Sequence, residues 1–181
     1  MAVQTLISPE EFLALPDQEE YILEYDEGLV LEAPETDFEH GVIQGKIFRR
    51  VSEWSDVARA GVRVSQNAGF WLTDDKLRKP DVSIIRQEDL AALPRYKGGL
   101  RGCPEIAVEV ISDTERVSDI EAKAKLYLAT GARAVWKVYP QSRTVVVQLR
   151  SGHVRLLAPG DFLEDAELLP GLRIPVAERF D

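Results

Sequence analysis

The stretch "PEIAVEVISD", residues 104–113, carries the strongest strand signal in this sequence. Its apolar run from Ile106 to Ile111 has the length of a strand and is interrupted once, at Glu109. Side chains alternate along a strand, so Ala107, Glu109 and Ile111 share one face, while three apolar residues share the other. A strand that is apolar on both faces is typical of the middle of a sheet. An isolated buried carboxylate is costly, so we expect either a neighbour that uses the charge of Glu109 or a strand less buried than its composition suggests.

The composition indicates one soluble globular domain. Of the 181 residues, 45% are hydrophobic and 29% are charged, which is enough apolar material for a core and too much for a disordered chain. The single cysteine, Cys103, allows no internal disulfide and fits a reducing compartment. No apolar stretch is long enough to cross a bilayer, and the first residues lack the layout of a secretion signal. We therefore expect a cytoplasmic protein without a membrane partner.

The net charge restricts the ways in which this chain could bind nucleic acid. A formal charge of −9 argues against a broad, sequence-independent grip on a phosphate backbone, which normally needs a basic surface. Lys and Arg are nevertheless dense between Arg78 and Arg101, so a local basic patch remains possible.

Local signals predict the order of helices and strands. Ser8 to Glu11 form a capping box that begins a short helix, and Asp26 to Gly28 form a turn between two strands. The other expected elements are a helix at about 37–60, a hairpin at 62–72 turning near Gln66 and Asn67, a strand at 80–86, a short helix at 88–93, a loop at 94–103, a helix at 116–130, strands at 132–140, 144–150 and 153–158, and a docked tail at 169–180. This order predicts an α/β (α+β) fold with a mixed central sheet flanked by helices, as a single domain over residues 1–181.

Asp81 is the second residue that interrupts an apolar pattern. It follows Pro80, which cannot extend a central strand on its amide side, so Asp81 lies at or near the start of its strand. A side chain at a strand end can reach a cleft. The alternative is that Pro-Asp is only a turn into the strand.

Lys123 is the third. It lies within the helical stripe Ile120, Ala124, Tyr127 and Leu128. Asp119, Lys123 and Tyr127 also follow at i, i+4 and i+8, so Asp119 could pair with Lys123. The alternative is a lysine at the edge of the stripe, with its ammonium in water.

These three residues could meet in space, because the strand that carries Glu109 leads directly into the helix that carries Lys123. Two carboxylates supply the hard oxygen ligands that Mg²⁺ or Mn²⁺ prefers. A lysine nearby could orient or help deprotonate a water and stabilise charge on a phosphate. A divalent metal, an activated water and a cation are the components of phosphodiester hydrolysis.

Several segments resemble the Uma2 family, also called DUF820. They are "KPDVSII" around Asp81, "VEVIS" around Glu109, and "DIEAKAKLY" followed by "TGARAVWKVYP". The chain also resembles the family in "LEYDEGLV" with Glu24 and Gly28, in "EHGVI" with His40, and in "LPGLRIPV" near the end. This chain departs from the family pattern at Ala134 and Val135, where the family usually has an acidic and an aromatic residue.

The resemblance implies a restriction-endonuclease-like fold of the PD-(D/E)xK superfamily and a role for each matched residue. Asp81 and Glu109 would bind the metal, and Lys123 would be the catalytic lysine. The ordinary motif places that lysine two residues after the acid, where this chain has Ile111, and the family pattern moves it to the next helix. Glu24 and His40 would line the site or contact the metal from outside.

Other residues carry weaker signals. Asp119 and Tyr127 are candidates to line the site. Arg95, Lys97 and Arg101 lie in a loop with several glycines before the Glu109 strand, where they could contact phosphate or simply be solvated. Tryptophans 54, 71 and 136 are expected in the core or at an interface, and Cys103 is expected to be inert.

The residues leave more than one function open. The first is a metal-dependent endonuclease that hydrolyses DNA. The second is a catalytically silent protein that binds nucleic acid or protein, or acts in assembly, on the same scaffold, which the acidic balance supports. A third would hydrolyse another phosphate ester. The resemblance also implies a homodimer, because many enzymes of this fold use two subunits to cut both strands of duplex DNA.

Overall fold

The strands form a central sheet and a second sheet beside it. The computed structural model describes residues 5–16, 21–34, 38–96 and 98–180. Within these ranges the central sheet has the order β12-β11-β10-β9-β6-β3. Its members are β3 (Val62–Gln66), β6 (Val82–Arg86), β9 (Ile106–Val110), β10 (Ala134–Tyr139), β11 (Thr144–Leu149) and β12 (Val154–Leu157). Strand β9 pairs parallel with β10 and antiparallel with β6, which makes the sheet mixed.

Strand β9 lies inside the central sheet, as its sequence predicts. All five of its residues are buried. Ile106, Val108 and Val110 belong to the hydrophobic cluster on one face, and Ala107 belongs to the cluster on the other. Glu109 shares the face of Ala107, because side chains alternate along the strand.

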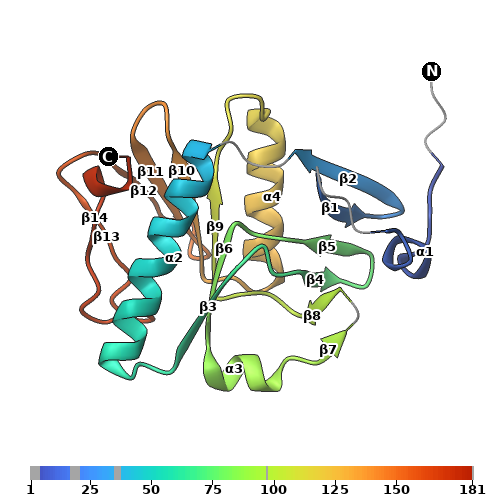
Figure 1. The fold of residues 1–181 in the computed structure, drawn as a ribbon, viewed down its shortest axis with the longest axis horizontal. Coiled ribbons are helices and arrows are strands. Elements are labelled where there is room, and N and C mark those ends of the chain that lie inside the picture. Colours follow the sequence, from blue (N-terminus) through green and yellow to red (C-terminus); the bar gives the residue numbers. More distant parts are fainter. Residues whose placement is uncertain (1–4, 17–20, 35–37, 97, 181) are drawn as a thin grey trace.

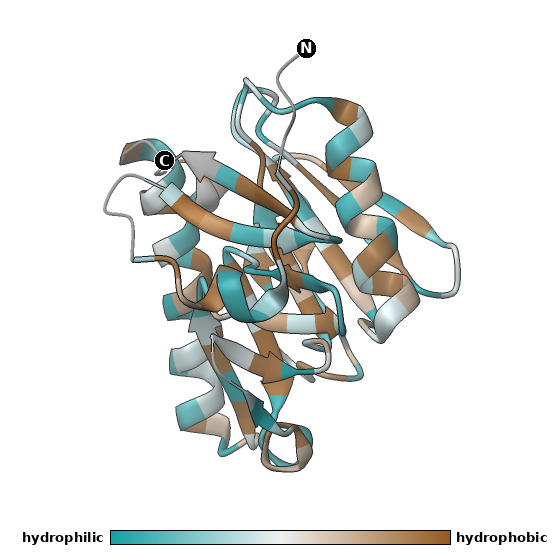
Figure 2. Cartoon of the chain, turned by 90° about the vertical axis from the view of Figure 1, so that its right-hand side faces the viewer, coloured by the Kyte–Doolittle hydropathy of each residue, from teal (hydrophilic) through white to brown (hydrophobic). Residues whose placement is uncertain are grey.

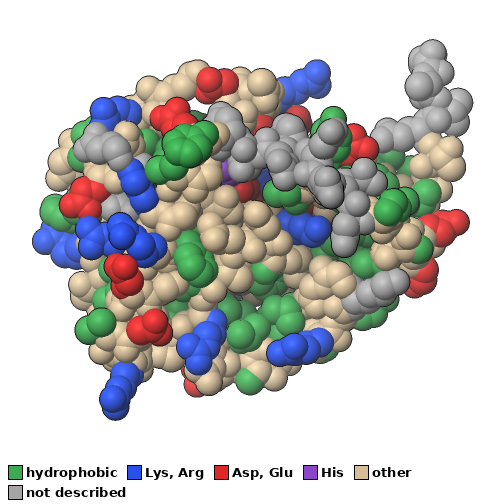
Figure 3. Space-filling model, viewed as in Figure 1, with side chains coloured by type: hydrophobic (Ala, Val, Ile, Leu, Met, Phe, Trp, Pro, Cys, Tyr) green, Lys and Arg blue, Asp and Glu red, His purple; other side chains and the backbone are tan. Residues whose placement is uncertain are grey.

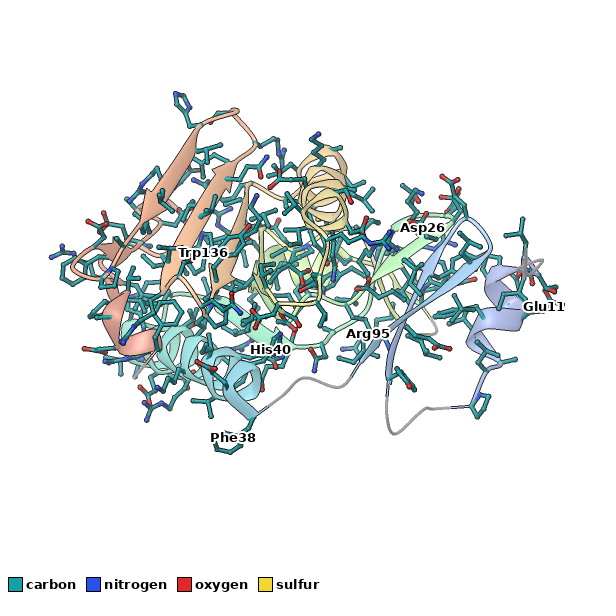
Figure 4. All side chains as sticks on the ribbon, turned by 90° about the horizontal axis from the view of Figure 1, so that it is seen from above. Glu11, Asp26, Phe38, His40, Arg95 and Trp136 are labelled. Atoms are coloured by element: carbon teal, nitrogen blue, oxygen red, sulfur yellow. The ribbon has the colours of Figure 1, made fainter. Side chains whose placement is uncertain are left out.

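One long helix covers each face of the central sheet. Helix α2 (Phe38–Ala58) packs Ile43, Ile47 and Val51 into the cluster that contains Ile106 and Trp136. Helix α4 (Val117–Thr130) packs Ala124 and Tyr127 into the opposite cluster. Figure 1 shows the two helices on opposite sides of β6 and β9, and Figure 4 shows Trp136 among the strands of this sheet.

The C-terminal tail docks on the α2 side of the sheet, as expected. Strands β13 (Phe162–Leu163) and β14 (Ile174–Pro175) form a small sheet, followed by the 3-10 helix η1 (Ala177–Arg179). Several tail residues are buried in the main cluster, namely Leu163, Leu168, Leu169, Leu172, Ile174 and Val176.

The second sheet lies on the other side of α4 from the central sheet (Figure 1). Its order is β2-β1-β5-β4-β8-β7. Its members are β1 (Tyr21–Asp26), β2 (Leu29–Pro34), β4 (Phe70–Thr73), β5 (Lys76–Arg78), β7 (Arg95–Tyr96) and β8 (Gly99–Arg101). The short helices α1 (Pro9–Leu13) and α3 (Gln87–Ala92) complete the described elements. Phe12 of α1 packs on Tyr25 and Trp71, and Figure 2 shows brown apolar segments along the strands.

Two predictions about the strands are wrong. The hairpin expected at 62–72 does not form: β3 pairs with β6 in the central sheet, whereas β4 pairs with β5 and β8 in the second. The chain leaves the central sheet at Asn67, which has a positive φ of 51°. The loop expected at 94–103 contains β7 and β8. Gly69 and Gly99 allow β8 to approach β4, because a Cβ on Gly69 would lie 2.1 Å from the carbonyl oxygen of Gly98.

The predicted start of α1 is confirmed. The capping box forms, since the Ser8 hydroxyl accepts from the Glu11 amide and the Glu11 carboxylate accepts from the Ser8 amide. In the described part of the chain, no helix is both long enough and apolar enough to cross a membrane.

Candidate active site

A cleft of about 1220 Å³ lies where the second sheet meets the central sheet and α4. It is lined by β1, the start of α2, the segment that follows β9, and one side of α4. Of the residues predicted for the site, the described lining contains Glu24, His40, Asp81, Glu109, Asp119 and Lys123. Figure 3 looks into this region and shows a histidine beside acidic and basic side chains in a hollow.

Asp81 lies just before β6 and is attached to the neighbouring strand. Its Oδ2 accepts a hydrogen bond of 2.7 Å from the amide of Val110, the residue directly after Glu109. Its backbone carbonyl accepts from the buried Gln44 of α2 at 2.7 Å. The first bond holds the Asp81 carboxylate beside Glu109, and the second holds the Asp81 backbone to α2.

Glu109 is buried, with 9% of its surface exposed, and each of its carboxylate oxygens has a donor. Lys123 Nζ donates to Oε2 at 3.1 Å, and the Tyr127 hydroxyl donates to Oε1 at 2.9 Å. Burial raises the pKa of Glu109 to about 8; Lys123 and Tyr127 oppose this rise, while Asp81 and Glu24 add to it. The strand is as buried as its pattern predicts, and Lys123 is the neighbouring cation that favours the ionised form of Glu109 against the effect of burial.

The charge of Lys123 is maintained by carboxylates on two sheets. Its Nζ lies 3.2 Å from Glu24 Oε1 as well as 3.1 Å from Glu109 Oε2. Burial opposes the charge, but Glu109, Glu24 and Asp81 outweigh it and hold the pKa of Lys123 above its usual range. The lysine is therefore an ammonium at neutral pH.

Lys137 is a buried lysine on the same face of the sheet, paired in register with Glu109. Its ammonium donates instead to Glu121 of α4 and, at 3.2 Å, to Gln148. The geometry thus selects Lys123 as the lysine that contacts Glu109.

His40 lies in the first turn of α2, at the edge of the cleft (Figure 4). Its Nε2 is 3.2 Å from Asp81 Oδ2, so the histidine contacts one of the two central carboxylates directly.

Arg78 is a site residue that the sequence analysis missed. It is buried on β5, its Nε lies 3.7 Å from Glu24 Oε2, and it also pairs with Asp26. The only sequence signal was its place in a cation-rich stretch, and pairing between β1 and β5 was not predicted.

The pairing that the spacing of Asp119 and Lys123 allowed does not form. Among the described contacts, Asp119 accepts from the Ser118 hydroxyl and Lys123 pairs with Glu24 and Glu109. Tyr127 is fully buried and contacts the site through Glu109.

Two of the three loop cations do not line this cleft. Neither Arg95 nor Arg101 is among the described residues that line it. Arg101 pairs with Asp74 at 2.6 Å and stacks over the Tyr96 ring. Lys97 lies outside the described residues. The Lys and Arg residues that do line the cleft are Lys76, Arg78, Lys79, Arg116, Lys123 and Lys125.

The donors at this site fit a hard divalent cation that keeps several water ligands. Both described side-chain contacts of Asp81 involve Oδ2, which leaves Oδ1 available to a metal ion. Glu109 also has lone pairs beyond those that accept from its two donors. Among the described residues, no three Asp, Glu, His or Cys side chains are grouped to hold a metal without help. Mg²⁺ is commonly bound by one or two carboxylates together with water and substrate phosphate.

Comparison with solved structures establishes the class of fold. A crystal structure from Anabaena variabilis ATCC 29413, described as "a putative nuclease belonging to DUF820", matches with a TM-score of 0.80 at 20% identity and covers 96% of this chain and 97% of that one. The DNA complex of DrdV has a TM-score of 0.43 and 16% identity, and covers 76% of this chain and 11% of that one, a likeness too weak to support an argument.

The sequence establishes the family. The model of the Uma2 family, described as "Putative restriction endonuclease", matches residues 9–177. The chain therefore belongs to the Uma2 family, as its motifs predict. No curated protein is similar enough to count as a match.

Proposed function

We propose that this protein is a metal-dependent endonuclease that hydrolyses phosphodiester bonds in DNA. The proposal rests on the hydrogen bonds that connect Asp81, Glu109 and Lys123. Asp81 is bonded to the amide next to Glu109, and Glu109 is bonded to a charged lysine from the following helix. Family membership supports the same chemistry.

Each residue has a role in the proposed reaction. Asp81 and Glu109 would hold Mg²⁺ or Mn²⁺, which lowers the pKa of a bound water and offsets charge on a phosphate. Lys123 keeps its proton and stabilises negative charge on the phosphate or orients the attacking water. Tyr127 fixes the orientation of Glu109, and His40 fixes that of Asp81.

The proposal is tested by incubating plasmid, linear duplex and single-stranded DNA with Mn²⁺ or Mg²⁺. The wild type should cut at least one of them, chelation should stop the reaction, and Glu109→Gln should be inactive. Cleavage by purified Glu109→Gln at the wild-type rate would contradict the proposal.

The charge of the cleft favours one alternative. Its described lining has nine carboxylates and six Lys or Arg residues, which disfavours an anionic polymer unless cations accompany it. This supports the protein-binding form of the second function, a catalytically silent protein that binds another protein or acts in assembly. Tight Mn²⁺ binding without cleavage of any DNA would favour this alternative; cleavage of small phosphate esters alone would favour the third.

The homodimer remains a prediction. Strand β12 is at the edge of the central sheet and exposes Val154 and Leu156 on one face, which a second subunit could cover. Light scattering should give twice the chain mass of 20.3 kDa; the mass of one chain would contradict it.

A further inference from the structure

The Lys123 ammonium has two carboxylate partners that come from different sheets. Glu109 lies on β9 of the central sheet, and Glu24 lies on β1 of the second sheet. The two N–O distances, 3.1 and 3.2 Å, are nearly equal. Lys123 therefore joins the two sheets across the cleft.

Glu24 is held in place independently of Lys123. Its Oε1 accepts a 2.7 Å hydrogen bond from the amide of Lys79, and its Oε2 lies 3.7 Å from Arg78 Nε. Arg78 is anchored in turn, since it donates to the carbonyl of Tyr25 at 2.7 Å and pairs with Asp26. These contacts follow from the antiparallel pairing of β1 with β5. Glu24 is thus a fixed acceptor, not a mobile surface carboxylate.

A second carboxylate matters because Glu109 has two competing uses. As a proposed metal ligand it would share its charge between a divalent cation and Lys123, and that cation would repel the ammonium. A lysine bound to Glu109 alone would then lose most of its attraction to the site.

We propose that Glu24 is the positioning residue of the catalytic lysine: it holds Lys123 at the site while Glu109 binds the metal. This inference rests on the proposed function. It assigns Glu24 a role through Lys123, instead of the outer metal contact suggested by the family resemblance. The described contacts of Glu24 are all with nitrogen donors, which supports this assignment.

The first test observes the lysine itself and needs no cleavage. In nitrogen-15 spectra of lysine ammonium groups, the Lys123 signal is identified by its loss in Lys123→Met. It should be sharp in the wild type with and without saturating Mg²⁺. In Glu24→Gln the Lys123 signal should broaden, and Mg²⁺ should abolish it.

Glu32→Gln is the matched control, because Glu32 lies on the neighbouring strand, lines the same cleft and has no described contact with Lys123. The spectrum of Glu32→Gln should match that of the wild type. A Glu24→Gln signal as sharp as the wild type in both conditions would overturn the proposal.

The second test uses turnover, with circular dichroism to confirm folding. Glu24→Gln should lower kcat by about 10- to 100-fold, as is usual for partners that orient a site residue, with little change in KM. In the Lys123→Met background the same substitution should have no further effect, because its partner is gone. Additive losses would show that Glu24 acts on metal or substrate directly and would overturn the proposal. If the wild type cuts no DNA, the proposed function fails, and the ammonium spectra still decide the role of Glu24.

Discussion

Lys123 Nζ lies 3.1 Å from Glu109 Oε2, so the lysine of α4 reaches the acidic residue of β9. The ordinary motif places this lysine on the same strand, where this chain has the buried Ile111. In this chain the ammonium beside Glu109 therefore comes from helix α4 and not from the strand itself.

Replacing Lys123 should separate catalysis from metal binding. In Lys123→Met the rate of DNA cleavage should fall by about 10²- to 10³-fold, the usual effect of removing one group that stabilises transition-state charge. Mn²⁺ affinity, measured by calorimetry, should not fall, because the lysine is not a ligand and its charge competes with the metal. Weaker Mn²⁺ binding in this variant would contradict the assignment.

Asp81→Asn should weaken metal binding without unfolding the protein. The amide oxygen can still accept from Val110, but the charge is lost, and Mn²⁺ affinity should drop at least about tenfold. Asp119→Asn is the control, since Asp119 lines the same cleft and its carboxylate contacts Ser118. Equal affinities in the two variants would remove Asp81 from the ligand set.

Tyr127→Phe should destabilise the fold more than an ordinary buried hydroxyl deletion. It leaves a buried carboxyl oxygen of Glu109 without its donor, which costs about 1–3 kcal/mol. Tyr25→Phe, which removes a 2.8 Å bond to the neutral carbonyl of Ile7, should cost only about 1 kcal/mol. Urea unfolding measures both, and a smaller loss at Tyr127 would argue against the Glu109 contact.

The stability of the metal-free protein should decline with rising pH because of Glu109. Its pKa is about 8 in the folded chain, against an ordinary 4.5, so the fold favours the protonated form. The resulting stabilisation is complete below pH 4.5 and is lost as the pH rises to about 8. The wild type should therefore lose stability relative to Glu109→Gln over this range, and Mg²⁺, which needs the ionised carboxylate, should offset the loss near pH 8. Parallel pH profiles for the two proteins would contradict it.

The salt dependence of DNA binding can identify the cations that contact phosphate. If Arg116 and Lys125 of the cleft do so, Arg116→Ala and Lys125→Ala should each reduce the slope of log K against log salt by about 0.9. Arg101→Ala should leave the slope unchanged, because Arg101 is paired with Asp74. A reduced slope in Arg101→Ala alone would instead support the loop of Arg95, Lys97 and Arg101.

Most of the single-element predictions were correct because their signals are local. The apolar run around Glu109 predicted a central strand, and the stripe around Lys123 predicted the helix that carries it. The hairpin at 62–72 failed because strand propensity does not specify the partner: β3 and β4 have good strand sequences but enter different sheets. The ion pair that the i, i+4 spacing of Asp119 and Lys123 allowed does not form for a similar reason. Lys123 pairs instead with Glu24 and Glu109, which come from two different sheets.

The sequence by itself determined which residues would be out of place: a carboxylate in a buried strand, an aspartate at a strand start and a lysine in an apolar stripe. Each is visible because strand and helix periodicities repeat over a few residues. Only the tertiary structure decided what they contact. Glu24 and Arg78 join the site through the pairing of β1 with β5, and Lys123 reaches both sheets because α4 packs between them. Such contacts depend on the order of strands in the sheets, which is set by long-range packing and leaves no local pattern in the chain.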